Sequence, residues 1–84
     1  MYYVYIARSK KKPKIFYAGY TSNIQKRIER HNSGWSVYSK RYAPWYIETY
    51  ICFAEKRLAL QFENYLKSAS GKAFLTKRLI RKTI

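Results

Sequence analysis

Residues 2–8 read YYVYIAR and residues 15–20 read IFYAGY, and these two stretches decide the fold. β-Branched and aromatic side chains dominate both stretches, which predicts two strands. The polar segment between them contains one proline and four lysines, Lys10, Lys11, Lys12 and Lys14. This segment predicts a solvated hairpin turn, and the same lysines are candidates for contacts with phosphates.

A helix is expected next, over residues 22–33, with Thr21 or Ser22 as its N-cap and Asn32-Ser33-Gly34 at its end. Four residues share one face of this helix at i, i+3, i+4 and i+7: Ile24, Arg27, Ile28 and His31. The face therefore combines two apolar side chains with a guanidinium and an imidazole. A face that only packs would be apolar throughout, but the spacing alone leaves a packing role and a functional role open.

The rest of the chain predicts one more strand and two more helices. Residues 35–45 form a basic and aromatic connection, and residues 46–53 predict the third strand. A helix follows over about 55–68, with Leu58, Phe62 and Leu66 as its expected buried stripe and an adjoining stripe formed by Ala59, Glu63 and Leu66. Residues 72–84 predict a short amphipathic helix docked on the sheet.

The length allows one hydrophobic core, because a chain of 84 residues cannot divide its core between two domains. We therefore expect a single domain over residues 1–84. Its predicted class is α/β (α+β), with a small three-stranded, mainly antiparallel sheet flanked by helices.

The charge balance is the strongest feature of the composition. The chain has 18 Lys and Arg residues against four Glu and no Asp, for a formal net charge of +14. Nucleic acid is the expected partner, DNA above all, because each phosphate neutralised by Lys or Arg releases counterions. Besides the hairpin lysines, the candidate contacts to nucleic acid are Gly19, Lys26, Arg30, Lys40 and Arg41.

The sequence also argues against several classes of protein. The longest uninterrupted apolar stretch, Tyr2 to Ala7, is far shorter than the roughly 20 residues that span a bilayer, so no membrane partner is expected. The amino terminus lacks the features of a signal peptide, which favours a cytoplasmic protein. The single cysteine, Cys52, has no partner for a disulfide or a thiolate cluster and is expected to pack in the core.

The four glutamates limit any metal or acid/base site. Glu29 and Glu55 lie beside basic residues at exposed helical positions, and Glu48 is expected on the outward side of the third strand. Glu63 differs because it lies in the middle of a helix among residues that pack. An acid there needs a compensating cation, and the two candidates are a divalent metal with phosphate oxygens and a buried arginine.

These residues occur in an order that resembles the GIY-YIG nuclease superfamily. Tyr3-Val4-Tyr5 and Tyr17-Ala18-Gly19 resemble the two tripeptides of that family, and the following helix with Arg27 and His31 resembles its first helix. Glu63 falls where the family keeps its metal-binding glutamate. The likeness extends over nearly the whole chain and is greatest to the short single-domain bacterial members. It also implies a mixed order of the strands in the sheet.

The resemblance implies a metal-dependent endonuclease of low sequence specificity that cuts DNA. Its catalytic residues would be Tyr5, Tyr17, Arg27, His31 and Glu63. Glu63 would hold Mg²⁺ or Mn²⁺, and Arg27 would bind the phosphate. Either tyrosine would accept a proton from water if cationic surroundings lowered the pKa of its phenol, and His31 would orient a tyrosine or relay the proton.

Three positions depart from the family pattern. Tyr3 replaces a glycine, Ala18 replaces a branched residue, and Tyr20 stands where some repair nucleases have a lysine. The last difference argues against a mechanism that needs that lysine. A partner protein is expected to supply specificity, since members of the superfamily often borrow it from added domains.

Two other readings explain the charge without catalysis. One is a basic module that only binds nucleic acid, through Trp35, Tyr38, Tyr42 and Trp45, and the other is a ribosome-associated protein. Glu63 distinguishes them from a nuclease, because simple binding has no use for a lone acid in a cationic surface.

Overall fold

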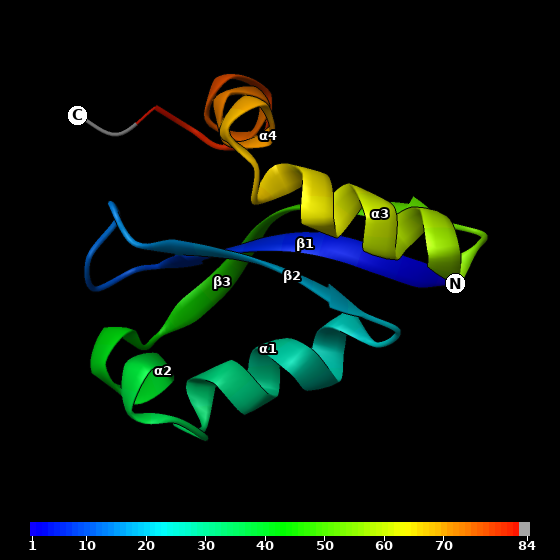
Figure 1. Ribbon diagram of the computed structural model, residues 1–84. Helices are drawn as coiled ribbons and strands as arrows, with labels where there is room; N and C mark the ends of the chain where they lie inside the picture. The colour runs from blue at the N-terminus through cyan, green and yellow to red at the C-terminus, as the bar shows by residue number, and fades with distance from the viewer. Residues whose placement is uncertain (83–84) are drawn as a thin grey trace.

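The computed structural model describes residues 1–82, and its helices lie on both sides of one three-stranded sheet (Figure 1). In Figure 1, α1 and α2 lie below the sheet and α3 and α4 lie above it. No helix within residues 1–82 is long and apolar enough to cross a bilayer. The elements in chain order are β1 (Tyr2–Ser9), β2 (Phe16–Thr21), α1 (Ile24–Asn32), α2 (Val37–Tyr42), β3 (Trp45–Phe53), α3 (Lys56–Leu66), α4 (Ala69–Phe74) and the π-helical turn η1 (Leu75–Leu79).

The sheet has the order β2-β1-β3, and both of its strand pairs are antiparallel. The predicted three-stranded α+β architecture is confirmed, and the sheet is antiparallel throughout its described strands. The middle strand, β1, is buried from Val4 to Ser9 because it has a neighbouring strand on each edge and helices on each face. Strand β2 lies at an edge, which leaves room beside it for a site.

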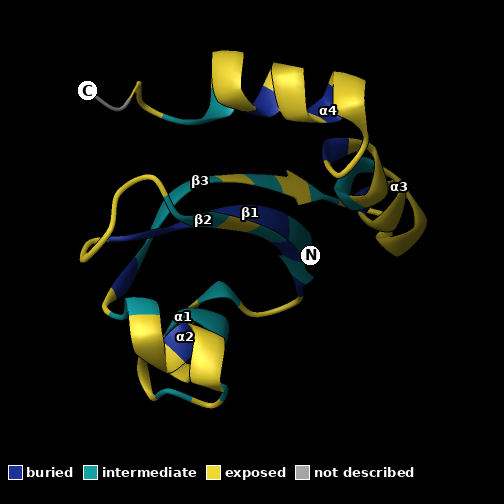
Figure 2. Cartoon of the chain, turned by 60° about the vertical axis from the view of Figure 1, so that its left-hand side comes forward, coloured by how far each residue is buried: buried dark blue, intermediate teal, exposed yellow. Residues whose placement is uncertain are grey.

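Alternation along β1 divides the interior into two clusters on opposite faces of the sheet. Val4 and Ile6 pack with Ala59, Leu66 and Leu75 on the side of α3 and η1. Three other buried residues form the second cluster on the side of α1: Tyr5, Ala7 and Trp45. Figure 2 shows this arrangement, with the outer surfaces of the helices mostly exposed.

The first helix differs from the prediction at its start. Asn23 is the N-cap, and its side chain accepts a hydrogen bond from the backbone N–H of Lys26. The predicted caps Thr21 and Ser22 lie two and one residues before Asn23, and the Thr21 hydroxyl instead accepts from the N–H of Asn23 at 3.1 Å. The helix ends as predicted, since Gly34 takes a φ of 75° that favours glycine.

The helix α2 was not predicted, because six residues are too few to show helical periodicity. Ser36 caps it in a reciprocal box with Ser39, whose side chain and backbone both bind Ser36. The indole N–H of Trp45 donates to the carbonyl of Ser39 at 2.9 Å. Trp45 is therefore buried and fixed, so the expectation that it contacts nucleic acid is wrong.

Helix α3 forms where it was predicted, but with a different buried stripe. Ala59 and Leu66 are buried, Phe62 is partly buried, and Leu58 is 41% exposed. The helix is rotated so that small Ala59 meets the sheet, which turns Leu58 outward. Cys52 is also exposed, contrary to prediction, because it lies on a strand at the edge of the sheet.

The carboxy-terminal segment forms helix earlier than predicted and docks on the sheet. Ser68 follows Lys67, the C-cap of α3, and caps α4 by accepting from the N–H of Gly71. Leu75 is buried against β1, and Leu79 packs against the same cluster. The helix ends at Leu79, and the last two residues of the predicted tail helix, 83–84, lie outside the described residues.

Candidate active site

The two tyrosines and the glycine of the sequence motif meet through the pairing of β1 with β2. Tyr5 lies opposite Gly19 in the register, and its hydroxyl lies directly over that glycine. A Cβ at position 19 would come within 2.5 Å of the Tyr5 oxygen, so the site requires glycine there. Gly19 therefore makes room for Tyr5, a role different from the predicted contact with nucleic acid.

Helix α1 brings His31 against both tyrosines. The His31 ring centroid lies 6.1 Å from that of Tyr5 and 5.5 Å from that of Tyr17, and the two tyrosine rings are 6.2 Å apart. Tyr5 and His31 are buried, whereas Tyr17 on the edge strand is 39% exposed. Three elements thus assemble a ring cluster that opens to solvent at Tyr17.

The tautomer of His31 follows from its hydrogen bond. Its Nδ1 lies 3.1 Å from the carbonyl oxygen of Arg27, and a carbonyl can only accept, so Nδ1 carries the proton. Burial lowers the pKa of His31 below its usual 6.5, and the charges of Arg27 and Arg30 lower it further. At neutral pH the ring is therefore uncharged, and Nε2 is free to accept a proton.

The surroundings of Tyr5 raise the pKa of its phenol, whereas the sequence predicted a lowered pKa. Burial raises the pKa of Tyr5 to about 12, and the nearby Arg27 only partly offsets that rise. The expectation of a lowered phenol pKa is wrong for Tyr5, because desolvation outweighs the positive charge. Its buried hydroxyl makes no geometrically well-formed hydrogen bond within residues 1–82, and the Arg27 guanidinium beside it can only donate, so the Tyr5 O–H proton has no acceptor in the described part of the chain.

Glu63 lies on α3, on the face of the sheet opposite α1 (Figure 1). Its negative charge contributes to the raised pKa of Tyr5, which places the two groups near each other. Glu63 forms an ion pair with Lys67 at 3.1 Å, and its side chain is 20% exposed. The alternative in which Glu63 pairs with a buried arginine is therefore wrong, since its partner is a lysine on the same helix that is itself 54% exposed.

The donor set around Glu63 fits a hard divalent cation. Within residues 1–82, no group of three His, Cys, Asp or Glu side chains could hold a metal by itself. Mg²⁺ does not need such a group, because it keeps several waters and binds through one or two carboxylates together with substrate phosphates. One partly exposed carboxylate beside an exposed lysine suits that mode of binding.

The chain matches the model of the GIY-YIG catalytic domain over residues 1–78. It belongs to the GIY-YIG family. A UPF0213 protein of Bacillus licheniformis is 44% identical over 57 residues, which cover 67% of this chain and 59% of the relative. The structure-specific endonuclease subunit SLX1 of Debaryomyces hansenii is 41% identical over 76 residues, which cover 79% of this chain and 21% of that protein.

A solved structure supports the same assignment to the GIY-YIG family. The solution NMR structure of a UPF0213 protein from Bacillus halodurans is 31% identical to this chain, with a TM-score of 0.53. The match covers 92% of this chain and 84% of that protein. The chain spans about three fifths of the length of the first UPF0213 relative and about a fifth of the endonuclease subunit.

Two lysines that the sequence did not single out lie beside the candidate active site. Lys67 and Lys72 line a cavity of about 360 Å³ beside Tyr17, between the edge strand and the helices α3 and α4. Their position beside Tyr17 could not be predicted from the sequence, because α3 and α4 meet β2 only in the folded chain. They add positive charge on the side of the edge strand opposite α1.

Trp35 is a second neighbour whose position was not predicted. It lies in the connection after α1, is 53% exposed, and its ring centroid is 6.2 Å from that of His31. The Arg30 guanidinium lies 4.8 Å from the Trp35 ring in a cation–π contact. An exposed, braced indole beside the site is suited to stacking on a nucleotide base.

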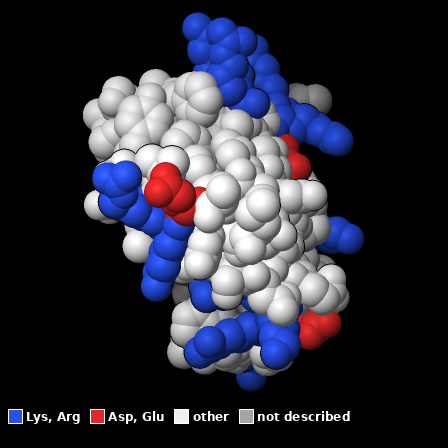
Figure 3. All heavy atoms as spheres, turned by 90° about the vertical axis from the view of Figure 1, so that its right-hand side faces the viewer, with Lys and Arg blue, Asp and Glu red and all other residues white. Residues whose placement is uncertain are grey.

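The other predicted contacts to nucleic acid form two groups of exposed residues. One group lies in the β1–β2 turn, where Lys10, Lys11, Lys12 and Lys14 all face solvent. The other lies on the two helices below the sheet: Lys26, Arg30, Lys40 and Arg41. On the face opposite the hairpin, Lys and Arg lie at the top, at the bottom and along the edges, around a largely uncharged centre (Figure 3). The positive charge is thus concentrated in separate regions.

Proposed function

We propose that this chain is a divalent-metal-dependent endonuclease that hydrolyses phosphodiester bonds of DNA. The observation that carries the proposal is the convergence of Tyr5, Tyr17 and His31 at one edge strand, with Glu63 nearby on the opposite face of the sheet. Membership of the GIY-YIG family and the relative named as a structure-specific endonuclease subunit support it. The net charge of +14 supports a nucleic acid as the substrate.

His31 is the proton acceptor in this proposal. Its neutral ring presents an unprotonated Nε2 toward the tyrosine cluster, and its lowered pKa keeps that nitrogen available at neutral pH. Tyr17 is exposed at the mouth of the cluster and contacts the imidazole, so it orients the attacking water for His31. The hydrogen bond from Nδ1 to the Arg27 carbonyl stabilises the imidazolium that forms.

Arg27 and Tyr5 stabilise the charge that develops on the phosphate. The Arg27 guanidinium lies near the Tyr5 hydroxyl and can bind two phosphate oxygens at once. Tyr5 keeps its proton because its pKa is about 12, so its unpaired hydroxyl donates a hydrogen bond to a phosphate oxygen. Burial holds Tyr5 in place before the substrate binds, and donors positioned in advance stabilise a transition state effectively.

Glu63 would hold Mg²⁺ or Mn²⁺ next to the scissile phosphate. A bound cation there supplies Lewis-acid stabilisation of the phosphate and the leaving oxygen. Lys67 would leave the carboxylate when the cation arrives, which is inexpensive because the lysine is largely exposed and an exposed pair contributes about 0–1 kcal/mol.

We further propose that the domain has low sequence specificity and takes its choice of substrate from a protein partner. The described site consists of side chains that would contact phosphate, water and one stacked base, none of which distinguishes a base sequence. The relative from Debaryomyces hansenii is named as a subunit, which is consistent with a partner for this chain too.

Incubation with labelled DNA tests the proposal. Single-stranded, duplex and branched substrates should each be mixed with the protein in Mg²⁺, Mn²⁺ or EDTA. We expect cleavage with a divalent metal and none in EDTA, and we expect Arg27→Ala to abolish it while the protein stays folded. Binding of all substrates without cleavage under any metal would instead support a module that only binds nucleic acid.

A further inference from the structure

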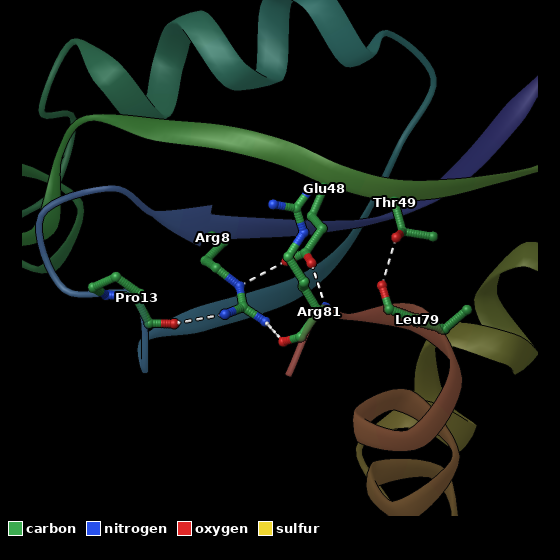
Figure 4. Close-up of polar contacts among 6 residues, drawn as sticks. All are labelled: Arg8, Pro13, Glu48, Thr49, Leu79 and Arg81. Carbon is green, nitrogen blue, oxygen red and sulfur yellow. Dashed lines mark hydrogen bonds and ion pairs between the residues drawn. The ribbon is translucent and has the colours of Figure 1, made fainter. Parts of the chain in front are cut away.

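One arginine on the central strand joins the hairpin turn to the carboxy-terminal segment (Figure 4). Arg8 is buried, and its Nη1 and Nη2 atoms donate to the carbonyls of Pro13 at 3.0 Å and Arg81 at 2.9 Å. Its Nε lies 2.6 Å from a carboxylate oxygen of Glu48. All three nitrogens of the guanidinium are therefore occupied, and Arg8 is not available to bind an external anion.

Glu48 completes this connection because of a bulge in β3. The register shifts so that Ile6 pairs with Thr49 and Ala7 pairs with Ile47, which leaves Glu48 between pairs. The carboxylate therefore points to the tail side, where it binds Arg8 and accepts from the backbone N–H of Arg81. The prediction of an outward, solvated Glu48 is wrong for this reason.

The tail is also attached to β3 through its backbone. The Thr49 hydroxyl donates to the carbonyl of Leu79, two residues before Arg81. Together these bonds hold the segment after η1 beside the sheet. They bring Arg81 and Lys82 to the hairpin, although more than sixty residues separate the two segments in the sequence.

The hairpin and the tail enclose an open cavity of about 610 Å³. We call it the hairpin–tail site, and it is lined by Arg8, Lys11, Lys12, Pro13, Lys14, Tyr46, Arg81 and Lys82. No carboxylate is among these lining residues, and within residues 1–82 the acid that contacts them, Glu48, is already paired with Arg8. Five cations, three on the hairpin and two on the tail, therefore face the same space without a counter-charge.

We propose that the hairpin–tail site binds the phosphate backbone of the nucleic acid at a second place, away from the proposed cleavage site. This proposal rests on the nucleic-acid substrate of the proposed function. The buried Arg8–Glu48 ion pair holds the cations of the hairpin and the tail close together. Their mutual repulsion is relieved when a polyanion binds and replaces their counterions. A backbone suits five separated cations, because it offers a series of phosphates instead of one.

The two sites are close along β1 but lie on opposite faces of the sheet. Tyr5 and Arg8 are three residues apart, or ~10 Å at ~3.3 Å per residue, and the hairpin lysines extend farther. Because Tyr5 faces α1 and Arg8 faces the tail, a nucleic acid held at both sites would have to pass around the sheet. Arg81 and Lys82 lie beyond residue 78, where the match to the family domain ends, so the site adds to that domain.

A pair of matched double variants tests this proposal. The first is Arg81→Gln with Lys82→Gln, and the control is Lys56→Gln with Arg57→Gln at the exposed start of α3. Each removes one lysine and one arginine, so both variants keep the same net charge. Binding to a fluorescent duplex of about 20 base pairs is measured in EDTA over a range of salt concentrations.

We expect the tail variant to flatten the slope of log K against log salt by about 1.8, or 0.9 for each lost phosphate contact, and the control to change it little. Equal effects in the two variants, or no effect in the tail variant, would overturn the proposal. Because the measurement needs no cleavage, its result is independent of catalysis. If the wild type cuts no DNA but the tail variant still flattens the slope of log K against log salt, the hairpin–tail site would be supported and the proposed nuclease activity would be refuted.

Discussion

Tyr5→Phe should stabilise the fold and impair the proposed reaction at the same time. The Tyr5 side chain is 0% exposed, and its hydroxyl has no hydrogen-bond partner within residues 1–82. A buried polar group without a partner costs about 1–3 kcal/mol, and phenylalanine removes that cost while it keeps the ring. We therefore expect the free energy of unfolding to rise by ~1 kcal/mol and Tm to rise by ~4–8 °C for a domain of this size.

The same substitution removes a donor aimed at the phosphate. Loss of one such donor typically lowers kcat by ~100-fold or more. Urea denaturation gives the change in stability, and a cleavage assay with Mg²⁺ gives the change in rate. Tyr65→Phe is the matched control, because its side chain is 41% exposed on α3 and water already satisfies its hydroxyl. A less stable Tyr5→Phe protein would refute this reasoning, since it would mean that the hydroxyl has a partner in the fold.

Three further predictions concern charge. Arg27→Ala should lower cleavage by ~100-fold or more and Arg27→Lys should rescue it poorly, because an ammonium cannot bind two oxygens of one phosphate as a planar guanidinium does; full rescue by lysine would reduce Arg27 to a generic charge. Since the pKa of His31 lies below 6.5, kcat/KM should rise with pH below that value and stay flat from about pH 7 to about pH 9, whereas a continued rise would point to a tyrosine as the base. Glu48→Gln should lower the free energy of unfolding by ~3–5 kcal/mol in urea denaturation, because it leaves Arg8 buried and unpaired. The exposed Glu29→Gln should change it by less than ~0.5 kcal/mol, and equal effects would rule out a structural role for the ion pair.

The sequence predicted the elements whose signals are local. β-Branched and aromatic composition located all three strands, and the helical spacing of Arg27 and His31 put both on the face of α1 that meets the sheet. Gly34 predicted the end of that helix, because the helix ends in a left-handed backbone conformation that favours glycine.

Features that depend on the packing of distant segments could not be read in this way. The Arg8–Glu48 pair joins residues forty apart and depends on a bulge that leaves no mark in the sequence. The direction of the pKa shift of Tyr5 depends on how deeply β1 is buried, which composition does not reveal. Leu58 was misplaced because both stripes of α3 are apolar enough to face the sheet, and only packing selects the one with Ala59.

Replacing the candidate metal ligand tests the central claim most directly. Glu63→Gln keeps the size of the side chain and removes its charge, and Glu55→Gln removes the same charge from an exposed position at the start of the same helix. With Mg²⁺ or Mn²⁺, we expect cleavage of labelled DNA by the wild type and by Glu55→Gln, and a loss of orders of magnitude in Glu63→Gln. DNA affinity in EDTA should be equal or slightly tighter in both variants, since each removes one negative charge. A Glu63→Gln protein that cuts as fast as the wild type, or a wild type that cuts nothing with any metal, would contradict the assignment of this site as a metal-dependent nuclease.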